Sequence, residues 1–485
     1  KYPYNRPIAS ASIGVMKNVP AINPAPPAIC FDQELIERYD GRGPRYTSYP
    51  TALQFSERLG ESGYRANALA SNAGGAPLSL YVHIPFCHSL CYYCGCNKIV
   101  TRNQARVERY MEMLHKEILM QSELFDRKRQ TQQLHFGGGT PTYLDNDQMD
   151  ELMAALRGAF NFDESETREF SIEVDPRTVD EDGIRYLTDL GFNRLSLGIQ
   201  DFDPTVQEAV NRMQSFKEVS GLVNAARAAN FKSISFDLIY GLPHQNVASF
   251  DATLDRVIGL RPDRLAVYNY AHLPDRFKGQ RMINADDIPA PSTKLDILHR
   301  TIDRLAECGY VYIGMDHFAL PEDDLVQARG DGTLQRNFQG YSTHGGCDLI
   351  GLGVSSISSI GNVYAQNAVT TMEYETLIEN DHLPVKKGIA VDDDDLLRAE
   401  VIQALMCYDR LDFDAFDASH DVDFRDYFRS ELERLQPLAS DELIELDSDG
   451  ISITAKGRLL LRCIAMVFDR HLAEIDTDKR FSRAI

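Results

Sequence analysis

Four of the chain's nine cysteines fall within ten residues, and this group constrains the fold more than any other feature of the sequence. Cys87, Cys91 and Cys94 have the spacing CxxxCxxC, and Cys96 follows two residues later. The preceding run, 80–86, alternates apolar with other side chains, which predicts a buried strand that ends at the cysteines. Loops at the carboxyl ends of strands form the active site of an α/β sheet, so we expect the cysteines there.

The spacing of the cysteines narrows the chemistry that they can support. A structural zinc site usually takes two cysteine pairs from separate loops, and a CxC step is poorly suited to giving one ion two ligands. Disulfides do not suit an N-terminus that lacks a continuous apolar signal segment. Three thiolates in one loop match instead the ligation of a [4Fe-4S] cluster that keeps one iron open for S-adenosylmethionine. We therefore predict that Cys87, Cys91 and Cys94 bind such a cluster.

The motif also carries a family resemblance. CxxxCxxC with an aromatic residue before the third cysteine resembles the signature of the radical SAM superfamily. The longer stretch HIPFCHSLCYYCGCNKIVTR is similar to the oxygen-independent coproporphyrinogen III oxidases of haem biosynthesis, and the likeness extends from about Arg38 to the C-terminus. Cys96 and the segment NFQGYST at 337–343 match the true oxidases, whereas the related haem chaperones usually lack both.

Strand and helix patterns alternate regularly after the cysteine loop. Helical periodicity separates further predicted strands at 133–136, 169–174, 194–199, 233–240 and 264–270. Six consecutive βα units predict an α/β fold with a parallel sheet, curled into an incomplete (β/α)6-type radical SAM barrel. Apolar runs near 310 and 350 are expected to add strands to it.

Composition divides the chain into four parts. Residues 1–38 read as an irregular N-terminal extension, and 39–79 resemble the family's segment that covers the active site. The catalytic barrel is expected over 80–371, followed by a mainly helical, winged-helix-like C-terminal domain over 372–485. That last domain has few clustered basic residues, so a lid or packing role is favoured over DNA binding.

Several polar residues belong to the predicted strands: Glu173 and Gln200 stand at strand ends, and the strand 233–240 carries Asp237. Glu173, Gln200 and Asp237 offer acceptors that suit the ribose hydroxyls and the ammonium group of S-adenosylmethionine, although helix capping or solvation would also account for each of them. The planar fork of Arg212 suits the cofactor's carboxylate. Glycines at 137–139 would let a ligand approach the backbone closely, although a glycine run is more often a plain turn.

The resemblance assigns roles to individual residues. One S-adenosylmethionine would lie against Tyr81, Glu173, Gln200, Arg212 and Asp237, with the glycine motif that includes Gly138 holding its methionine amino group. A second would contact Tyr93, Gly139, Thr140, Ala271 and Ile357. Tyr93 stands where the family's pattern has phenylalanine. His83, Cys96, Phe338 and Gln339 are the candidates for electron or proton handling around the substrate.

The resemblance also implies the reaction. A 5'-deoxyadenosyl radical made from S-adenosylmethionine at the cluster would remove hydrogen from two propionate side chains of coproporphyrinogen III. Each propionate would lose CO₂ and an electron to become a vinyl group, giving protoporphyrinogen IX. A low-potential donor such as flavodoxin or ferredoxin would supply electrons, and an unidentified acceptor would remove them. A haem-binding chaperone and a radical SAM enzyme acting on another tetrapyrrole are the alternatives.

Charge and hydropathy exclude other classes of function. The formal net charge of −22 argues against a general nucleic-acid or membrane-surface binder. No stretch approaches the roughly 20 apolar residues of a membrane span. Nine cysteines without a predicted disulfide framework suit a reducing cytoplasm. We expect a cytoplasmic monomer.

Overall fold

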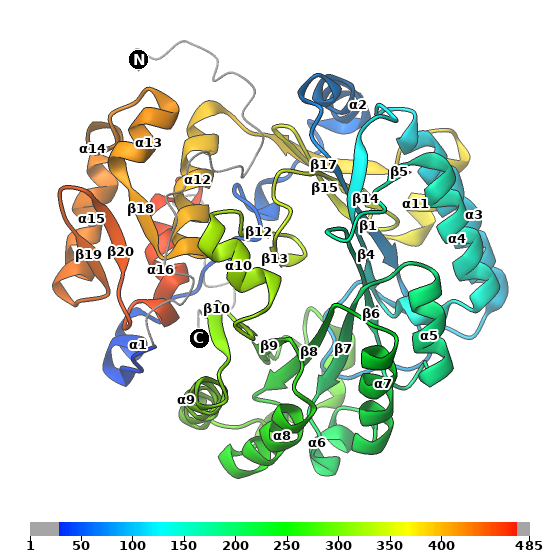
Figure 1. Ribbon diagram of the computed structural model, residues 1–485, viewed down its shortest axis with the longest axis horizontal. Coiled ribbons are helices and arrows are strands. Elements are labelled where there is room, and N and C mark those ends of the chain that lie inside the picture. The colour runs from blue at the N-terminus through cyan, green and yellow to red at the C-terminus, as the bar shows by residue number, and fades with distance from the viewer. Residues whose placement is uncertain (1–28, 473–485) are drawn as a thin grey trace.

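The structure is a computed structural model and describes residues 29–472, built around a 13-stranded sheet (Figure 1). Parallel pairing joins seven of the strands in the order β9-β8-β7-β6-β4-β1-β14. These strands are β1 (Leu78–Ile84), β4 (Gln130–Gly138), β6 (Glu169–Val174), β7 (Arg194–Gln200), β8 (Ser233–Tyr240), β9 (Arg264–Asn269) and β14 (Asp348–Leu352). The alternating apolar residues that predicted the strands are buried in them.

Helices follow six of the parallel strands and cover the outside of the sheet (Figure 1). They are α3 (Gln104–Ser122), α4 (Asn146–Ala159), α5 (Glu181–Asp189), α7 (Phe216–Ala228), α8 (Val247–Leu260) and α9 (Pro291–Glu307), with a short α6 (Pro204–Ala209) before α7. Capping boxes begin α4, α7 and α8, where a polar side chain and the N3 side chain satisfy each other's backbone N–H groups. The six predicted βα units are confirmed.

Antiparallel strands extend both edges of the sheet. Strands β10 (Val311–Gly314) and β11 (His317–Ala319) lie beyond β9, and β15 (Ile357–Ile360), β16 (Val363–Asn367) and β17 (Val385–Ala390) lie beyond β14. The order therefore ends at β10 and β17, and no pairing within residues 29–472 joins these two edges. The α/β class with added strands is confirmed, and the sheet remains open.

The C-terminal part of the chain has its own apolar core. Its elements are α12 (Asp393–Tyr408), β18 (Arg410–Asp412), α13 (Phe413–His420), α14 (Phe424–Tyr427), α15 (Arg429–Ser440), β19 (Ile444–Leu446), β20 (Gly450–Ile453) and α16 (Leu461–Ala465). The sheet order β18-β20-β19 beside these helices matches the predicted winged-helix pattern. The domain begins later than 372, because α11 (Thr371–Glu379) packs on α3 and β17 pairs with β16 in the main sheet.

Shorter elements complete the described chain. Before the barrel lie α1 (Gln33–Tyr39) and α2 (Gly60–Ser71), the latter packed against β17. Within it are β2 (Phe86–Cys87), β3 (Ile99–Val100), β5 (Asn161–Phe162), α10 (Asp324–Asp331), β12 (Gln335–Asn337) and β13 (Gly340–Ser342). The expectation of an irregular 1–38 is wrong for its described end, because Asp32 caps α1 by accepting from the Leu35 N–H. Residues 1–28 lie outside the described part.

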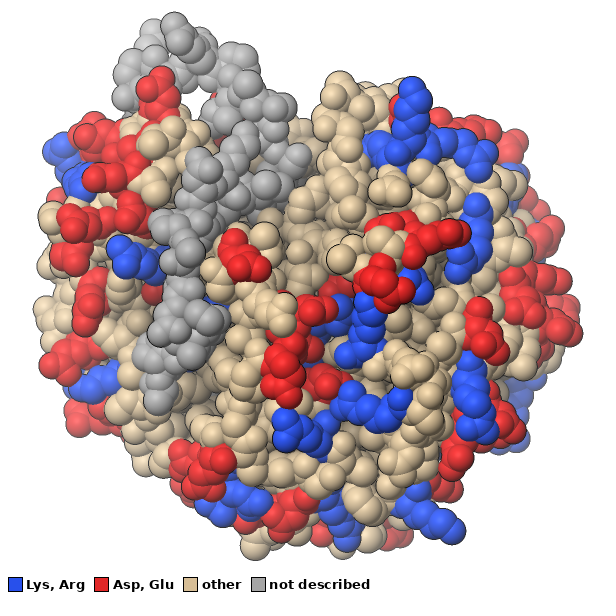
Figure 2. Space-filling model, in the orientation of Figure 1, with Lys and Arg blue, Asp and Glu red and all other residues tan. Residues whose placement is uncertain are grey.

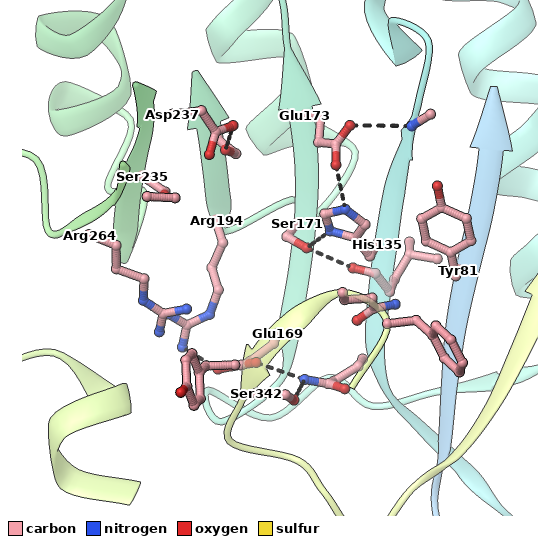
Figure 3. A pocket seen from close by; sticks show the side chains of 18 of the residues that line it. Tyr81, His135, Glu169, Ser171, Glu173, Arg194, Ser235, Asp237, Arg264 and Ser342 are labelled. Carbon is pink, nitrogen blue, oxygen red and sulfur yellow. Dashed lines mark hydrogen bonds and ion pairs between the residues drawn. The ribbon is translucent and has the colours of Figure 1, made fainter. Parts of the chain in front are cut away.

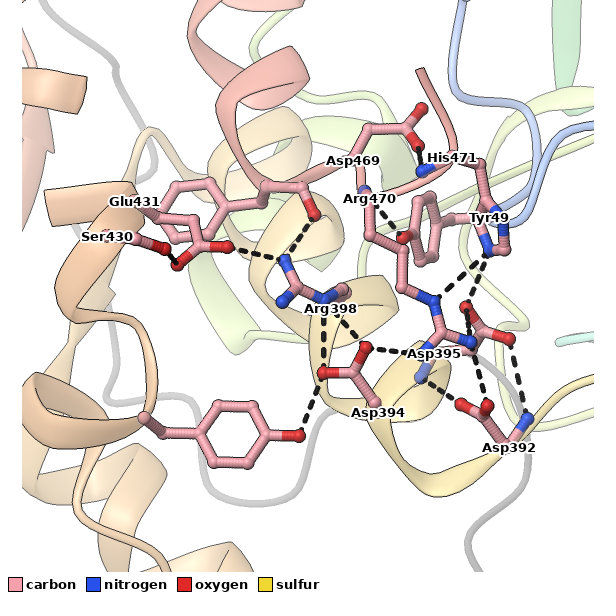
Figure 4. Close-up of polar contacts among 12 residues, drawn as sticks. Tyr49, Asp392, Asp394, Asp395, Arg398, Ser430, Glu431, Asp469, Arg470 and His471 are labelled. Carbon is pink, nitrogen blue, oxygen red and sulfur yellow. Dashed lines mark hydrogen bonds and ion pairs between the residues drawn. The ribbon is translucent and has the colours of Figure 1, made fainter. Parts of the chain in front are cut away.

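The segment 39–79 bridges the C-terminal domain and the barrel. Tyr46 and Tyr49 are buried in the C-terminal core, where the Tyr49 hydroxyl accepts a hydrogen bond from the Arg470 N–H at 3.2 Å. Figure 4 shows that Arg470 lies among acidic side chains at the start of α12, with an ion pair of 3.0 Å to Asp395. On the barrel side, the Arg45 guanidinium pairs with Asp316. The segment therefore ties the two domains together.

A second buried charge network also joins the domains, and it gives a stability prediction. Asp409 forms ion pairs with Arg329 at 2.8 Å and Arg458 at 3.0 Å, and all three side chains are at most 7% exposed. Removing this carboxylate would take a buried counter-charge away from both guanidinium groups.

We expect Asp409→Asn to lower the free energy of unfolding by about 3 kcal/mol. Asp409 ends α12 at φ +57°, a conformation that asparagine also accepts, so the change isolates the charge. Chemical denaturation would measure it. Asp421→Asn is the matched control, because Asp421 ends α13 at φ +53° and is exposed; it should change stability by less than about 0.5 kcal/mol. Equal effects of the two changes would contradict the prediction.

The surface is mixed in charge. On the face that Figure 2 shows, acidic and basic side chains are interspersed among uncharged ones. Within the described range, 29–472, no helix is both long and apolar enough to cross a membrane.

Candidate active site at the cysteine end of the sheet

The cysteine loop leaves the end of β1 and is closed by a short parallel pairing. Phe86 of β2 pairs with Ile99 of β3, and Cys87 pairs with Val100. Cys87, Cys91 and Cys94 all line one cavity of about 530 Å³. The sequence prediction that strand 80–86 delivers the cysteines to a site at the carboxyl end of the sheet agrees with this placement.

Two arginines and an aspartate surround the sulfur of Cys91. Arg177 Nη2 lies 3.3 Å and Arg212 Nη1 3.6 Å from Cys91 Sγ. Asp175 fixes both guanidinium groups, with ion pairs of 2.7 Å to Arg177 and 2.9 Å to Arg212. Both guanidinium groups therefore direct N–H donors at this sulfur. Sequence reasoning missed Asp175 and Arg177, although both directly follow the strand end that carries Glu173.

The other two cysteines differ in environment. A hydrogen bond from Cys96, helped by Lys98, lowers the pKa of the Cys94 thiol to about 6, although burial opposes this shift. Burial raises the pKa of the Cys87 thiol to about 11, although the nearby Thr140 hydroxyl works against burial. Cys96 lies beside Cys94, since its backbone N–H donates to Cys94 Sγ at 3.4 Å.

The glycine motif after β4 needs glycine for steric reasons. A Cβ atom on Gly139 would lie 2.6 Å from the backbone of Pro85, and one on Gly138 would lie 2.7 Å from the His83 ring. Gly138 also has φ +116°, which other residues rarely adopt. The motif therefore brings its backbone against the cysteine loop, and Gly138, Gly139 and Thr140 line the same cavity as the cysteines.

Hydrogen-bond acceptors face this cavity from neighbouring strands. Burial opposes the ionisation of Glu173, but hydrogen bonds from His135 at 3.3 Å and the Gly138 N–H at 3.2 Å outweigh burial and lower its pKa. Burial and the nearby Glu173 raise the pKa of Asp237 to about 7 although Ser196 donates to Asp237 at 3.1 Å. Gln200 lines the same space. Figure 3 shows Glu173 and Asp237 on neighbouring parts of the sheet.

His83 has a defined orientation on β1. Its Nε2 lies 2.9 Å from the carbonyl oxygen of Asn97, and its Nδ1 lies 3.1 Å from the Tyr81 hydroxyl. The carbonyl can only accept, so Nε2 carries the proton and Nδ1 accepts from Tyr81. Burial lowers the pKa of His83, which keeps the ring neutral.

A second cavity of about 560 Å³ continues from the first toward the other end of the strands. The two share lining residues, namely Cys96, Gly138, Glu173, Ser196, Asp237 and Tyr268. Phe338, Gln339 and Ile357 line the second cavity, together with Tyr81 and His83. The predicted residues therefore gather around one continuous space. Ala271 is the exception: it lines neither cavity, and its carbonyl oxygen accepts from Gln280 at 3.2 Å.

Small and polar residues line the inner face of the sheet, which sequence reasoning missed. Every second residue of the central strands lines the joined cavities: Glu169, Ser171 and Glu173 on β6, Arg194, Ser196 and Gly198 on β7, Ser233, Ser235 and Asp237 on β8, and Arg264, Ala266 and Tyr268 on β9. Branched apolar side chains fill the interior of a closed barrel. Small and polar residues here leave room for a ligand, and the two-residue alternation in the sequence was the signal for it.

The N-terminal segment borders this space without lining it. Arg45 lies 5.9 Å from the centre of the Tyr268 ring, and Tyr268 lines both cavities. No residue of 39–79 belongs to the lining of either cavity. The expectation that the segment covers the active site therefore remains a prediction.

The residues present fit an iron–sulfur cluster with S-adenosylmethionine beside it. Within 29–472, no three His, Cys, Asp or Glu side chains are placed to hold a single metal ion. A cluster puts each thiolate on a different iron, so it does not need such convergence. Among the described residues Arg212 Nε has no hydrogen-bond partner, and the acceptors Glu173, Gln200 and Asp237 line the same cavity as Arg212.

Comparisons with known proteins identify the relatives of this chain. The family model described as the radical SAM superfamily matches residues 81–257, and the model of the HemN C-terminal domain matches 391–460. An oxygen-independent coproporphyrinogen III oxidase of Pseudomonas aeruginosa is 52% identical over 94% of this chain and 99% of the relative. The corresponding Escherichia coli protein is 50% identical over the same shares. The solved structure of coproporphyrinogen III oxidase (HemN) from Escherichia coli, a radical SAM enzyme, superposes with a TM-score of 0.87 at 49% identity, covering 92% of this chain and all of that one.

The parallel sheet, the cysteine loop on its first strand and the matched superfamily define the chain as a radical SAM protein. Within that class, the chain belongs to the family of oxygen-independent coproporphyrinogen III oxidases.

Proposed function

We propose that the chain converts two propionate side chains of coproporphyrinogen III into vinyl groups without oxygen, giving protoporphyrinogen IX. The observation that carries this proposal is one continuous cavity with the three cysteines at one end and Phe338 and Gln339 of the NFQGYST loop along its side. That space accommodates a ligand reaching from the cysteines deep into the sheet. Supporting it are relatives of the same printed name over nearly the full length of the chain.

The cofactors are those of the radical SAM class, a [4Fe-4S] cluster and S-adenosylmethionine. When bound, they supply a carbon radical that removes a hydrogen atom from substrate. Cys87, Cys91 and Cys94 would ligate the cluster. Tyr81, Glu173, Gln200, Arg212 and Asp237 would orient the S-adenosylmethionine nearest to it.

A second S-adenosylmethionine is a finer part of the proposal. Tyr93, Gly139 and Thr140 line the cavity at the cysteines, and Ile357 lines its continuation, so one ligand lying across the junction could contact all four. Ala271 lies outside the lining of both cavities, so its position does not support a contact with the second S-adenosylmethionine. Equilibrium dialysis of S-adenosylmethionine with the cluster-loaded protein would count the bound molecules.

The chain's own residues orient substrate and control protons. The neutral His83 ring accepts a hydrogen bond from Tyr81 at Nδ1 and donates its Nε2 proton to the Asn97 carbonyl oxygen. His83 is therefore suited to positioning the substrate, not to donating a proton to it. Cys96 lines both cavities and lies next to Cys94, where it can act between cofactor and substrate. We further propose that a low-potential carrier such as flavodoxin or ferredoxin supplies electrons, that the protein is monomeric, and that it works in the cytoplasm.

Product analysis tests the proposed function. Protein reconstituted with iron and sulfide is incubated without oxygen with coproporphyrinogen III, S-adenosylmethionine, a low-potential reductant and cell extract as the source of an electron acceptor. Absorbance and mass should show loss of two carboxyl groups and gain of two vinyl groups. A haem chaperone would leave the propionates intact, and an enzyme for another tetrapyrrole would cleave S-adenosylmethionine without this product.

The place of Arg212 gives a further prediction. Two sides of its guanidinium are held by Asp175 and by the Gly198 carbonyl oxygen at 2.6 Å, which aligns the remaining edge toward a ligand. We expect Arg212→Lys to weaken S-adenosylmethionine binding by about tenfold, because an ammonium cannot make these contacts together. Anaerobic titration would measure it. Arg185→Lys, a change in an exposed pair with Asp182, is the control. Equal affinity of wild type and Arg212→Lys would refute the role.

A further inference from the structure

The end of the cavity farthest from the cysteines carries guanidinium groups. Arg194 begins β7 and Arg264 begins β9, and both line the cavity. Figure 3 shows their guanidinium groups next to each other at the end of the strands opposite Asp237 and Glu173. Arg194 and Gln200 stand at the two ends of β7, so this arginine end lies about 20 Å from the cysteine end.

Carboxylates behind the arginines fix them in place. Arg264 Nε lies 2.9 Å from both oxygens of Asp323, just before α10. Arg194 pairs with Glu169 at 2.9 Å and with Asp324. These contacts do not use every N–H donor of the two arginines. Within the described residues, Arg264 Nη2 and Arg194 Nε have no hydrogen-bond partner. Anchored guanidinium groups with spare donors are preorganised for a planar anion.

A third guanidinium group, that of Arg336, lies behind the residues that line this end of the cavity. Arg336 is only 4% exposed and lies 4.8 Å from the centre of the Tyr341 ring, which lines the cavity. No carboxylate in the described part of the chain forms an ion pair with Arg336, and its Nη1 has no hydrogen-bond partner there. A buried charge of this kind is costly unless an anion approaches it.

His317 lines the same cavity as Arg194 and Arg264. Its ring packs edge-on against Tyr341 at 5.3 Å and against Tyr268 at 6.1 Å. Burial first and the nearby Arg336 second lower its pKa to about 3, although Asp316 opposes this shift. The ring is therefore neutral and adds no charge to this end of the cavity.

The two ends of the cavity thus differ in chemistry. The cysteine end carries Glu173 together with Arg177 and Arg212, whose guanidinium groups lie against Cys91, whereas the far end carries the guanidinium groups of Arg194 and Arg264 beside Glu169. A ligand that fills the whole space would place an anionic group at the arginine end. The substrate in the proposed function carries four propionates, of which only one at a time can lie at the reacting end.

We propose that Arg264 and Arg194, backed by Arg336, bind a propionate carboxylate of the substrate that is not the one reacting. This binding site rests on the proposed function and deepens it, because holding one propionate fixes which other propionate lies beside the cysteines. Arg264 makes the direct contact with the carboxylate, and Arg336 strengthens the positive potential at this end of the cavity.

The test compares carboxylate with ester. Arg264→Gln keeps a donor toward Asp323 but removes the charge. Binding of coproporphyrin III and of its tetramethyl ester to the cluster-loaded protein is followed by porphyrin fluorescence without oxygen. We expect Arg264→Gln to weaken coproporphyrin III binding by about 10- to 100-fold and to leave ester binding nearly unchanged. The KM for coproporphyrinogen III should rise in parallel.

Two further proteins make the result decisive. Arg261 lies on the loop before β9 and forms an exposed ion pair with Glu322. Arg261→Gln should bind coproporphyrin III and its ester as the wild type does. Arg336→Gln has no ion pair to lose and should also lower the preference for acid over ester, so it carries the test if Arg264→Gln does not fold. An unchanged preference in folded variants would overturn this proposal and leave the proposed function standing. Failure of the wild type to bind coproporphyrin III or convert coproporphyrinogen III would instead overturn both.

Discussion

Replacement of Cys87, Cys91 or Cys94 by serine is expected to reduce iron and acid-labile sulfide to near zero in protein reconstituted without oxygen. Each thiolate would hold a different iron, and a serine hydroxyl at neutral pH is a far weaker ligand. S-adenosylmethionine cleavage should disappear with the cluster. Iron and sulfide analysis with the visible absorbance of the cluster measures this directly.

Two other cysteines serve as comparisons. Cys308 is exposed at the end of α9, and Cys308→Ser should retain the full cluster. Cys96→Ser should also keep the cluster, although turnover should fall because Cys96 lines both cavities. A full cluster in any of the three ligand variants would contradict the assignment.

The second large effect is expected in the NFQGYST loop. Phe338 packs edge-on against Tyr364 at 5.7 Å and lines the cavity, and Gln339 places an amide nitrogen there without a partner among the described residues. We expect the double change Phe338→Ala and Gln339→Ala to lower vinyl formation by about 100-fold or more, because the substrate loses its fixed position relative to the reacting carbon. Cluster content should be unchanged.

Phe55 provides the matched control for that loop. It stacks on the same Tyr364 ring at 6.0 Å but does not line either cavity. Phe55→Ala should therefore lower the melting temperature and leave vinyl formation per cluster close to that of the wild type. Similar losses of activity in both proteins would indicate that Phe338 and Gln339 only support the fold.

Periodicity in the sequence was sufficient to predict the six βα units, because each strand alternates a buried outer face with an inner face and each helix has an apolar stripe. The same alternation placed Glu173 near the end of β6 and Asp237 within β8. Ser196 and Ser235 follow the same alternation. A polar residue inside a parallel strand does not show, however, whether the inner face of the sheet packs against a core or faces a ligand.

Contacts between distant segments were beyond sequence reasoning. The carboxylate that fixes Arg264 comes from Asp323 on a loop after β11, and the partner of Tyr46 is Asp469, more than 400 positions later. The predicted boundary at 371/372 falls before β17, although the pairing of β17 with β16 makes this strand part of the main sheet. Such pairings depend on tertiary structure and leave no local pattern.

Stoichiometry tests the central claim most directly, because each vinyl group formed should consume one S-adenosylmethionine. Cluster-loaded protein, coproporphyrinogen III, reductant and extract are incubated without oxygen, and CO₂, 5'-deoxyadenosine, methionine and porphyrinogen products are quantified together. The account predicts two of each small product for every protoporphyrinogen IX. Cofactor cleavage without loss of carboxyl groups, or intact coproporphyrinogen III with a full cluster across several reductants and extracts, would contradict it.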